Sequence, residues 1–325
     1  MKVLRFKKLG DPLRVLKLEE VIDPQPGPNE VRIRITYRTI NPSDLYFISG
    51  EYGLKPQFPA TPGFEGTGFI DALGTNVTNL KVGQRVIPFG VSGTWKEYLI
   101  AQPGQVIPIP DELADQTAAQ LLINPITAFI LCTKELTLQR DNWFLQTAAG
   151  STLGRIVLQL AKLKGFKTVN FVRRREQVDE LLELGADAVI CTEDKDVIQQ
   201  VMKITKKGAH AGIDSVGGRT GSLALQSLRP GRTLIVYGLL SRELTPINTR
   251  DMIFKQTIIR GFWLNDWFKR TPPDEIFATF NQLMELATNQ QIIPPVEAEY
   301  DLTDFKAAIE HSMRPGRHGK VLMRS

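Results

Sequence analysis

Hydrophobic and polar residues alternate in short runs over about the first 120 positions of the chain. Residues 30–36 read EVRIRIT and residues 85–88 read RVIP, and this period of two predicts β-strands that bury one face. Proline and glycine recur between such runs, for example in PQPGP at residues 24–28, and indicate turns. We therefore expect residues 1–120 to form a β-rich unit with many loops.

From about residue 121 the pattern changes to short apolar runs that alternate with segments of helical periodicity. Continuous apolar strands joined by helices are typical of a parallel sheet that is covered on both faces. The predicted strands are residues 142–148, 168–172, 188–191, 211–216 and 233–237, and the predicted helices are residues 153–164, 176–184 and 197–204. Residues 290–325 return to the first pattern and are expected to rejoin the first unit. The chain is thus predicted to be an α/β protein with one domain at residues 1–120 and 290–325 and a second at 121–289.

Composition narrows the class of protein without changing this prediction. The 325 residues are 42% hydrophobic and 23% charged, which are ordinary globular values. A net charge of +5 suits an anionic ligand but is weak support for nucleic-acid binding. Two cysteines are too few for a disulfide framework or a thiolate zinc site. No run approaches the ~18 apolar residues of a membrane helix, and no signal peptide is visible, so a cytoplasmic protein is expected.

A turn rich in small residues follows the first predicted strand of the second domain. Residues 148–154 read AAGSTLG, and Ala149, Ser151 and Gly154 occupy the glycine positions of the dinucleotide pattern G-x-G-x-x-G. Small residues let the backbone approach a pyrophosphate at the start of the helix. An ordinary tight turn would also use them. The position at the first strand-to-helix junction, with further strand and helix units behind it, favours nucleotide binding.

Three arginines follow the second predicted strand, where a fold that binds NAD usually carries an acidic residue for the ribose hydroxyls. They are Arg173, Arg174 and Arg175. Guanidinium groups can bind a 2′-phosphate through paired hydrogen bonds, so the sequence favours NADPH over NADH. A solvated basic helix start is the alternative, and it is disfavoured because cations sit poorly at the positive end of a helix.

The domain order, the small-residue turn and the segment VGQRVI at residues 82–87 resemble the medium-chain dehydrogenase/reductase superfamily. The resemblance implies a GroES-like β-rich catalytic domain and a Rossmann domain with a doubly wound parallel sheet. In the zinc alcohol dehydrogenases of this superfamily, the metal ligands lie in C-x-T-D-x-H and G-H-E. The matching positions here carry Asn41, Tyr46 and Phe64, and a phenyl ring cannot coordinate zinc. The three histidines are far from these segments, so no metal site is expected and alcohol dehydrogenase chemistry is disfavoured.

Within the superfamily the chain is most similar to the mitochondrial-type 2-enoyl thioester reductases. The similar segments are NPSD at 41–44, SGEYG at 49–53, GTW at 93–95, NP at 124–125, IFK at 253–255, RGFWL at 260–264, and Trp267. The resemblance implies NADPH-dependent reduction of the C=C bond of an enoyl thioester, with Tyr52 as the catalytic residue. A phenol keeps its proton at neutral pH and can donate it to the enolate oxygen that forms when hydride reaches the β-carbon. Tyr46 is the competing tyrosine and is expected to pack instead.

The same resemblance assigns the other site residues. Asn124 would contact the nicotinamide or its ribose, and Lys320 would be a late cationic contact to the cofactor. Gly150, Ser151, Thr152, Leu153 and Gly154 belong to the pyrophosphate turn, Tyr237 and Gly238 to the nicotinamide end of a strand, and Phe262, Trp263 and Leu264 to the nicotinamide face and acyl pocket. Phe262 and Trp263 could equally pack in the core or at a dimer contact, since residues 257–263 are strand-like and could form a sheet edge. Trp95 and Trp267 either line an acyl slot or are simply buried.

Two other functions stay open at this level. An NADPH:quinone oxidoreductase has the same fold and no zinc, and it needs no acid at Tyr52 because a quinone is already activated. An NADPH-binding protein that contacts RNA through the basic segments 203–207 and 314–320 is a third possibility, and solvated loops explain those segments more simply. We expect a small-molecule substrate, a homodimer suggested by the superfamily, and neither nucleic acid nor membrane as a partner.

Overall fold

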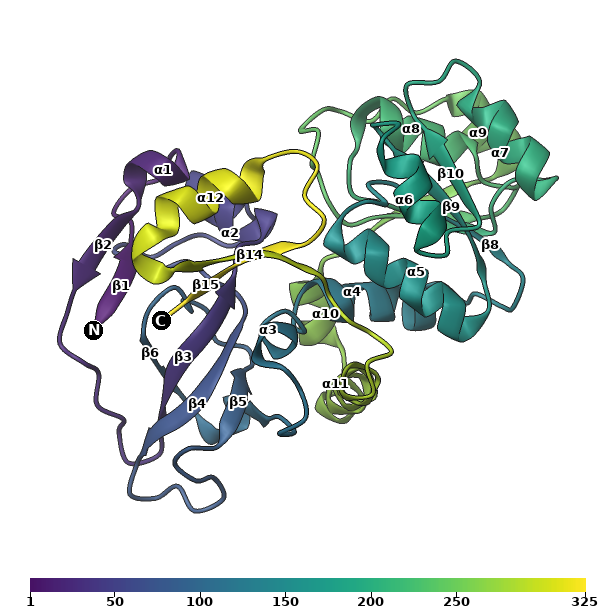
Figure 1. Ribbon diagram of the computed structural model, residues 1–325. Helices are drawn as coiled ribbons and strands as arrows, with labels where there is room; N and C mark the ends of the chain where they lie inside the picture. Colours follow the sequence, from purple (N-terminus) through teal and green to yellow (C-terminus); the bar gives the residue numbers. More distant parts are fainter. The chain divides into compact units, whose positions relative to one another are not determined.

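The computed structural model describes residues 1–325 and divides them into two compact units. Unit 1 comprises residues 1–123 and 287–325, and unit 2 comprises residues 124–286. The predicted boundaries at 120/121 and 289/290 differ from these by three residues. Figure 1 shows that unit 1 is made of the first and last parts of the chain, drawn in purple to blue and in yellow, and unit 2 of the middle part.

Unit 1 is built around strands, in keeping with its alternating sequence. Its strands are β1 (Lys2–Arg5), β2 (Lys17–Glu20), β3 (Val31–Thr39), β4 (Gly66–Leu73), β5 (Arg85–Pro88), β6 (Tyr98–Ala101), β7 (Val106–Pro108), β14 (Val296–Asp301) and β15 (Lys320–Arg324). Its helices are α1 (Pro12–Val15), α2 (Pro42–Ser49), α3 (Asp115–Ala118) and α12 (Phe305–Met313), with 3-10 turns at Pro103–Gln105 and Leu302–Asp304.

The seven-stranded sheet of unit 1 joins both ends of the chain. Its order is β14-β15-β3-β4-β5-β7, with β6 paired to β3. β15 pairs antiparallel with β3 in the register Leu322↔Thr39. Residues 290–325 therefore do rejoin the first domain, because they complete its sheet. Alternate residues of β3, such as Ile33 and Ile35, are fully buried in the core, as the period of two requires.

Unit 2 alternates strands with helices. Its strands are β8 (Trp143–Gln146), β9 (Lys167–Val172), β10 (Ala188–Cys191), β11 (Ala211–Asp214), β12 (Thr233–Val236) and β13 (Ile258–Gly261). Its helices are α4 (Asn124–Ile130), α5 (Thr152–Lys164), α6 (Gln177–Glu183), α7 (Val197–Thr205), α8 (Gly218–Gln226), α9 (Thr249–Lys255), α10 (Leu264–Arg270) and α11 (Pro273–Thr288), and a π-helical turn spans Leu131–Glu135.

The sheet of unit 2 is entirely parallel and has the order β10-β9-β8-β11-β12-β13. The chain winds outward from β8 in one direction and from β11 in the other, which is the doubly wound Rossmann arrangement. Two apolar clusters cover its faces. Val169 and Phe171 of β9 pack with residues of α7 and α8, whereas Val172 packs with residues of α5 and α6. The predicted α/β fold with a GroES-like domain and a Rossmann domain is confirmed.

The predicted strands and helices of unit 2 match the structure to within a few residues at their ends. The helix α2, which contains the segment NPSD, was not predicted. Pro42 at its first position and Gly50 just beyond its end, with φ of 87°, are the signals that mark it. No helix is long and apolar enough to cross a membrane.

Candidate functional site

The carboxyl ends of β8 and β11 meet where the strand order of unit 2 reverses, which is the usual ligand-binding position of a doubly wound sheet. A buried hydrogen bond joins them. Thr147 Oγ1 donates to Asp214 Oδ1 at 2.7 Å, and Asp214 also accepts from the amides of Val216 and Gly217 at 2.9 and 3.1 Å. Asp214 thus shapes both turns at this point. Sequence analysis missed it, although an Asp after a buried strand and before two glycines is a typical turn signal.

The small-residue turn connects β8 to α5 as predicted. Ser151 is the N-cap of α5, and its hydroxyl accepts from the amide of Gly154 at 3.2 Å. A Cβ on Gly154 would lie 2.3 Å from the carbonyl oxygen of Ala149, so this residue must be glycine for the helix to approach the strand. A Cβ on Gly150 would lie 2.2 Å from Nε2 of Gln177. Most of the turn is buried, and only Ala148 and Ser151 in it are partly exposed.

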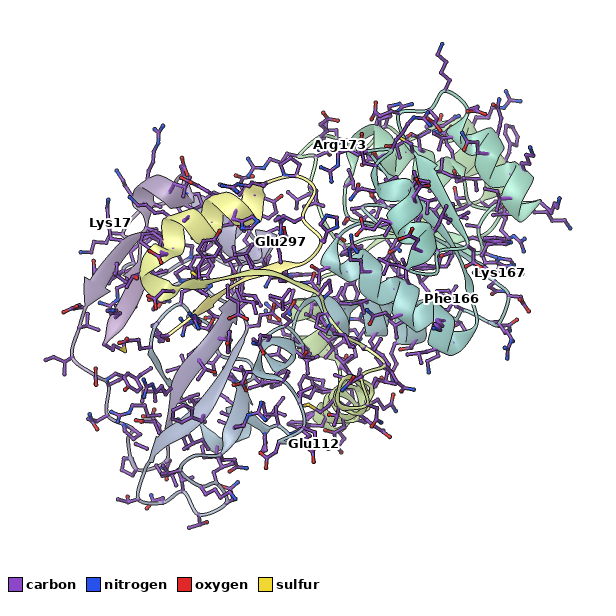
Figure 2. All side chains as sticks on the ribbon, in the orientation of Figure 1. Lys17, Glu112, Phe166, Lys167, Arg173 and Glu297 are labelled. Atoms are coloured by element: carbon purple, nitrogen blue, oxygen red, sulfur yellow. The ribbon has the colours of Figure 1, made fainter.

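The arginines lie at the carboxyl end of β9, where Figure 2 labels Arg173 at one end of the strand and Lys167 at the other. Arg173 and Arg175 are exposed and Arg174 is half-buried. Arg175 is bound to Asp194, whereas Arg173 and Arg174 have no carboxylate partner. The guanidinium groups of Arg173 and Arg174 are therefore available to an anionic group at this edge. Arg175 would have to leave Asp194 before it could bind such a group.

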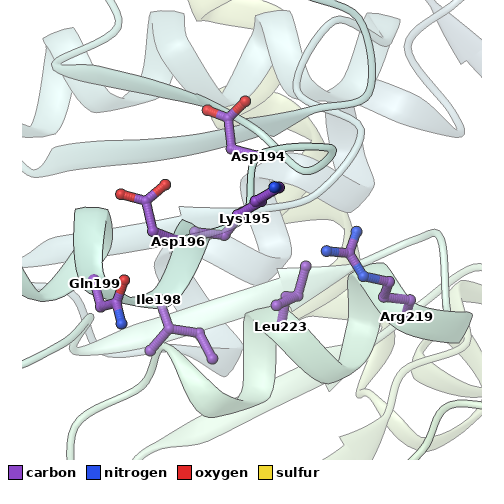
Figure 3. Close-up of a pocket in the computed structure, with 8 residues that line it drawn as sticks. Asp194, Lys195, Asp196, Ile198, Gln199, Arg219 and Leu223 are labelled. Atoms are coloured by element: carbon purple, nitrogen blue, oxygen red, sulfur yellow. The ribbon is translucent and has the colours of Figure 1, made fainter.

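A hollow of about 120 Å³ lies beside this ion pair, at the carboxyl end of β10. Figure 3 shows Asp194 and Lys195 from the loop before α7 on one side, and Arg219 and Leu223 of α8 on the other. Arg219 donates to the carbonyl of Thr192 at 2.5 Å, which fixes that side. The hollow is too small for a whole dinucleotide. It lies at the same edge of the sheet as the three arginines, formed by the carboxyl ends of β9 and β10.

The remaining predicted cofactor residues of unit 2 lie on three elements. Asn124 begins α4. Tyr237 and Gly238 follow β12, and Gly238 passes so close to Ser215 that a Cβ would lie 2.8 Å from its carbonyl oxygen. Phe262, Trp263 and Leu264 follow β13, where the amide of Phe262 donates to the carbonyl of Val236 at 2.8 Å. Phe262 is buried and Trp263 is half-buried, so β12 and β13 present these residues at their carboxyl ends.

Unit 1 contains a second candidate site, formed by a buried polar cluster of Thr39, Asn41, Asp44, Glu65 and Lys320. Glu65 Oε1 accepts from Thr39 Oγ1 and from Asn41 Nδ2, both at 2.7 Å. The other carboxyl oxygen, Oε2, is buried without a partner. Sequence analysis singled out Asn41 and Lys320 and gave no role to Thr39, Asp44 and Glu65. Their role depends on contacts between segments that are distant in sequence.

Burial strongly perturbs the ionisable groups of this cluster. Burial raises the pKa of Asp44 to about 7, although amide hydrogen bonds from Asn41 and Phe64 oppose the shift. Burial likewise raises the pKa of Glu65 and lowers that of Lys320, and the attraction between Lys320 and the two carboxyls opposes both shifts. Lys320 is thus a buried countercharge at the start of β15. It is not part of an exposed basic loop, as the RNA-binding alternative required.

Asp44 connects this cluster to the predicted catalytic tyrosine. Asp44 Oδ1 accepts from the amide of Phe64 at 3.1 Å, and Oδ2 accepts from the amide of Asn41 at 2.8 Å. Phe64 in turn packs against Tyr52, with ring centroids 5.3 Å apart. Tyr52 is half-buried beside the core and its amide donates to the carbonyl of Tyr46 at 3.2 Å. Its ring is therefore packed against the core of unit 1 and remains partly exposed.

The tryptophans proposed for an acyl slot are both buried. Trp95 is fully buried in the core of unit 1, and its indole nitrogen donates to the carbonyl of Thr39 at 3.0 Å. The simple burial reading is therefore correct for Trp95, which supports the strand that leads to Asn41. Trp267 is 3% exposed and packs edge-on against Phe268 in unit 2.

The residues at the former ligand positions do not fit a catalytic zinc ion. The amide nitrogen of Asn41 is bound to Glu65 and Thr39, and Phe64 offers only a phenyl ring. Neither supplies the thiolate or imidazole that zinc prefers. No group of three or more His, Cys, Asp and Glu side chains is arranged to hold a metal ion.

The comparisons with known proteins agree with this geometry. Residues 27–111 match the alcohol dehydrogenase GroES-like domain, and residues 152–288 match the zinc-binding dehydrogenase family. The chain is 33% identical over 322 residues to the mitochondrial enoyl-[acyl-carrier-protein] reductase of Rattus norvegicus, covering 97% of this chain and 86% of that protein. It belongs to the medium-chain dehydrogenase/reductase superfamily. The protein is an oxidoreductase, in the part of the superfamily that contains the enoyl reductases.

Two solved structures cover the whole chain. A protein from Bacillus thuringiensis, provisionally named an NADPH:quinone reductase, superposes with a TM-score of 0.92 at 37% identity, over 98% of its own chain. The Etr1p/NADP/crotonyl-CoA complex superposes with a TM-score of 0.89 at 26% identity, over 99% of its chain. Both reductase types that the sequence resembled therefore share this fold. The rat relative is named as mitochondrial, so the cytoplasmic location stays a prediction.

Proposed function

We propose that the protein reduces the C=C bond of 2-enoyl thioesters with NADPH and that Tyr52 is its catalytic acid. The observation that carries this proposal is the half-buried phenol of Tyr52, held on Phe64 beside positions where zinc-dependent relatives carry metal ligands. Because Asn41, Tyr46 and Phe64 at those positions offer an amide, a phenol and a phenyl ring in place of metal ligands, we expect a protein hydroxyl to stabilise a developing oxyanion.

The cofactor is NADPH. Bound NADPH supplies a hydride from C4 of the nicotinamide to the β-carbon of the enoyl group. The turn at residues 150–154 binds the pyrophosphate through its amides, Arg173 and Arg174 bind the 2′-phosphate, and the ends of β12 and β13 contact the nicotinamide. We propose that Asn124 contacts the cofactor directly. Lys320 is buried, and we propose that it acts on the cofactor indirectly, through its charge within the buried polar cluster.

Tyr52 acts on the thioester. As hydride reaches the β-carbon, the electron pair of the C=C bond moves toward the thioester oxygen, which becomes an enolate. The phenol of Tyr52 donates a hydrogen bond to that oxygen and delivers a proton, which water then replaces. The α-carbon gains its hydrogen when the enol returns to the thioester. Asp44 holds the backbone of Phe64 and so keeps Tyr52 in position.

A steady-state assay with crotonyl-CoA and NADPH tests the role of Tyr52. Tyr52→Phe removes the hydroxyl but keeps the ring on Phe64, and we expect kcat to fall by about 100-fold or more. Tyr46→Phe is the matched control, since it alters the neighbouring tyrosine and should change kcat less than about threefold. Equal activity of Tyr52→Phe and the native enzyme would exclude Tyr52 as the acid.

Quinone reduction is the second candidate function, favoured by the 37% identity to the Bacillus thuringiensis protein. A quinone accepts hydride on a ring that is already activated, so its reduction needs no acid from Tyr52. Assaying the same two variants with a panel of quinones separates the functions. Quinone turnover that exceeds enoyl thioester turnover and is unaffected by Tyr52→Phe would favour this second reading.

The proposed cofactor preference is tested by charge reversal at the edge of β9. Arg173→Asp combined with Arg174→Asp places acidic groups where we expect the 2′-phosphate, so kcat/KM for NADPH should fall and that for NADH should rise. Lys203→Asp, on the exposed face of α7, is the control for the added negative charge. An unchanged NADPH preference in the double variant would contradict the assignment.

We also propose a homodimer that forms along β13. This strand is the edge of its sheet and pairs only with β12. Ile253, Phe254 and Ile258 beside it are 66%, 75% and 51% exposed. A second copy of β13 would satisfy the open edge and cover these side chains. Sedimentation velocity should show a dimer for the native protein and a monomer for Phe254→Glu with Ile258→Lys, and a native monomer would refute the proposal.

A further inference from the structure

A cluster of cationic side chains lies at the amino edge of the sheet of unit 2, opposite the edge that carries the dinucleotide residues. It consists of His210, Arg229 and Arg232, which directly precede or lie close to the first residues of β11 and β12. Figure 2 marks this edge by Lys167, at the start of β9, whereas Arg173 marks the other end of that strand. None of the three residues has a role in the proposed reaction. We call them the amino-edge cluster.

The backbone holds the two loops of the amino-edge cluster together. Ala209 donates to the carbonyl of Ser227 at 2.9 Å, and Arg229 donates to the carbonyl of Ala209 at 3.0 Å. His210 is tied to the first residue of β8, because its amide donates to the carbonyl of Trp143 at 2.7 Å. The side chains of His210 and Arg229 therefore project from fixed positions.

The hydrogen bonds of His210 determine which ring nitrogen carries the proton. Nδ1 accepts from the amide of Trp143 at 2.9 Å, so Nδ1 has no proton. In the neutral ring Nε2 must then carry it and act as a donor. Nε2 faces NH1 of Arg229 at 2.6 Å, and a guanidinium nitrogen is also a donor. Two donors thus face each other where a hydrogen bond requires an acceptor.

The rest of the cluster adds donors and no acceptor. Arg229 Nε is buried without a partner. Arg232 is exposed, and no hydrogen bond or ion pair involves its side chain. No carboxylate lies close enough to pair with Arg229 or Arg232. Burial and the two guanidinium groups lower the pKa of His210, as unbalanced positive charge requires. Partly buried cations without counter-ions are costly, and a bound anion would remove that cost.

We propose that the amino-edge cluster binds a phosphate group. A tetrahedral dianion accepts from His210 Nε2 and from both guanidinium groups at once, and arginine side chains match phosphate oxygens through paired donors. Its charge of roughly −1.5 to −2 balances the two arginines, which a single carboxylate would not. The phosphate can be free inorganic phosphate or the monoester of a small metabolite. The site does not depend on the proposed reductase reaction.

Calorimetric titration of the protein saturated with NADP⁺ tests the proposal, because the cofactor then occupies the phosphate contacts at the other edge. Inorganic phosphate should bind with one site per chain at constant ionic strength, with chloride as the balancing anion. Arg232→Gln, which changes an exposed side chain, should weaken binding about tenfold, and Arg229→Gln more strongly. Arg250→Gln on α9 is the matched control and should bind as the native protein does.

The source of the phosphate follows from a second titration with sn-glycerol 3-phosphate. Tighter binding of the monoester identifies a phosphorylated metabolite, and tighter binding of inorganic phosphate identifies the free ion. Thermal unfolding provides an independent readout, in which phosphate should raise the Tm of the native protein but not that of Arg229→Gln. The proposal is overturned if phosphate binds no better than chloride or acetate, or if Arg232→Gln and Arg229→Gln bind it as tightly as the native protein.

Discussion

The two candidate sites of this protein are built in different ways. The turn of unit 2 that we propose binds the pyrophosphate would do so through backbone amides, and it lies within seven consecutive residues, 148–154. The buried polar cluster of unit 1 uses side chains, and it joins residues as far apart as Thr39 and Lys320. A site made of backbone tolerates side-chain changes that leave its geometry intact, whereas a site made of buried side chains loses its balance of charge when one member changes. Four predictions test this contrast.

The largest effect is expected at Glu65. Glu65→Ala removes the acceptor of two buried donors, Thr39 and Asn41, and the countercharge of Lys320, so we expect the free energy of unfolding to fall by about 3–5 kcal/mol. Glu65→Gln keeps an acceptor and should cost less. Hydrogen exchange of the unit 1 amides at increasing urea concentration measures the free energy of unfolding of both variants. Equal losses for the two variants would mean that the charge does not matter.

The next effect is expected at Gly154. A Cβ there would lie 2.3 Å from the carbonyl oxygen of Ala149, so Gly154→Ala should shift α5 and lower the free energy of unfolding by about 1–3 kcal/mol. Because the shift moves the amides of the turn, NADPH should also bind more weakly. Gly104→Ala, where a Cβ would meet nothing, is the control. Unchanged stability and affinity would show that the turn is not tight.

A pH-dependent effect is expected at Asp44. Its pKa is raised from 3.8 to about 7 in the folded protein, so the folded state retains a proton that the unfolded chain loses between these pH values. The resulting stability is complete below pH 3.8 and is lost as pH rises to about 7, by at most ~1.4 kcal/mol per pH unit. Asp44→Asn lacks this dependence. Urea unfolding of both proteins at pH 5, 6 and 7 should show that the free energy of unfolding of the native protein falls relative to that of the variant as pH rises. The same pH dependence in both proteins would contradict the raised pKa.

The smallest effect is expected at Ser151. Ser151→Ala removes the N-cap hydrogen bond to Gly154 and should lower the free energy of unfolding by about 1 kcal/mol. Because we propose that the backbone amides of the turn bind the pyrophosphate, NADPH affinity should change less than about threefold. Ser151→Thr retains the hydroxyl and should restore most of the stability. A loss of affinity as large as that of Gly154→Ala would show that the Ser151 hydroxyl itself binds the cofactor.

Sequence reasoning could propose a site in unit 2 because the residues of that candidate site are neighbours in the chain. Small residues between a strand and a helix, here Ala149, Ser151 and Gly154, predict a tight turn. Arg173 to Arg175 directly follow the next strand. It did not find Asp214, since the bond to Thr147 exists only once β8 and β11 are paired. The same holds for His210 and Arg229, which lie 19 residues apart in sequence and meet through the pairing of their loops.

In unit 1, sequence reasoning identified the altered ligand positions but not the buried polar cluster that surrounds Asn41. Asn41, Tyr46 and Phe64 are visible as substitutions in recognisable segments, and together with the few cysteines and distant histidines they disfavoured zinc. The cluster of Glu65, Asp44 and Lys320 was not visible, because a carboxyl or ammonium group in a sequence is most often solvated. Lys320 was expected as a late cofactor contact, and its burial beside two carboxyls follows from the pairing of β15 with β3.

The sequence by itself determined the alternating pattern of unit 1, the parallel sheet of unit 2 and the turn that begins α5, because each depends on the period or the order of nearby residues. The tertiary structure alone decided which charges are buried and which donors face each other. Those properties depend on the distance between side chains from separate strands and loops, and on the loss of water around them, and neither quantity exists before the chain has folded.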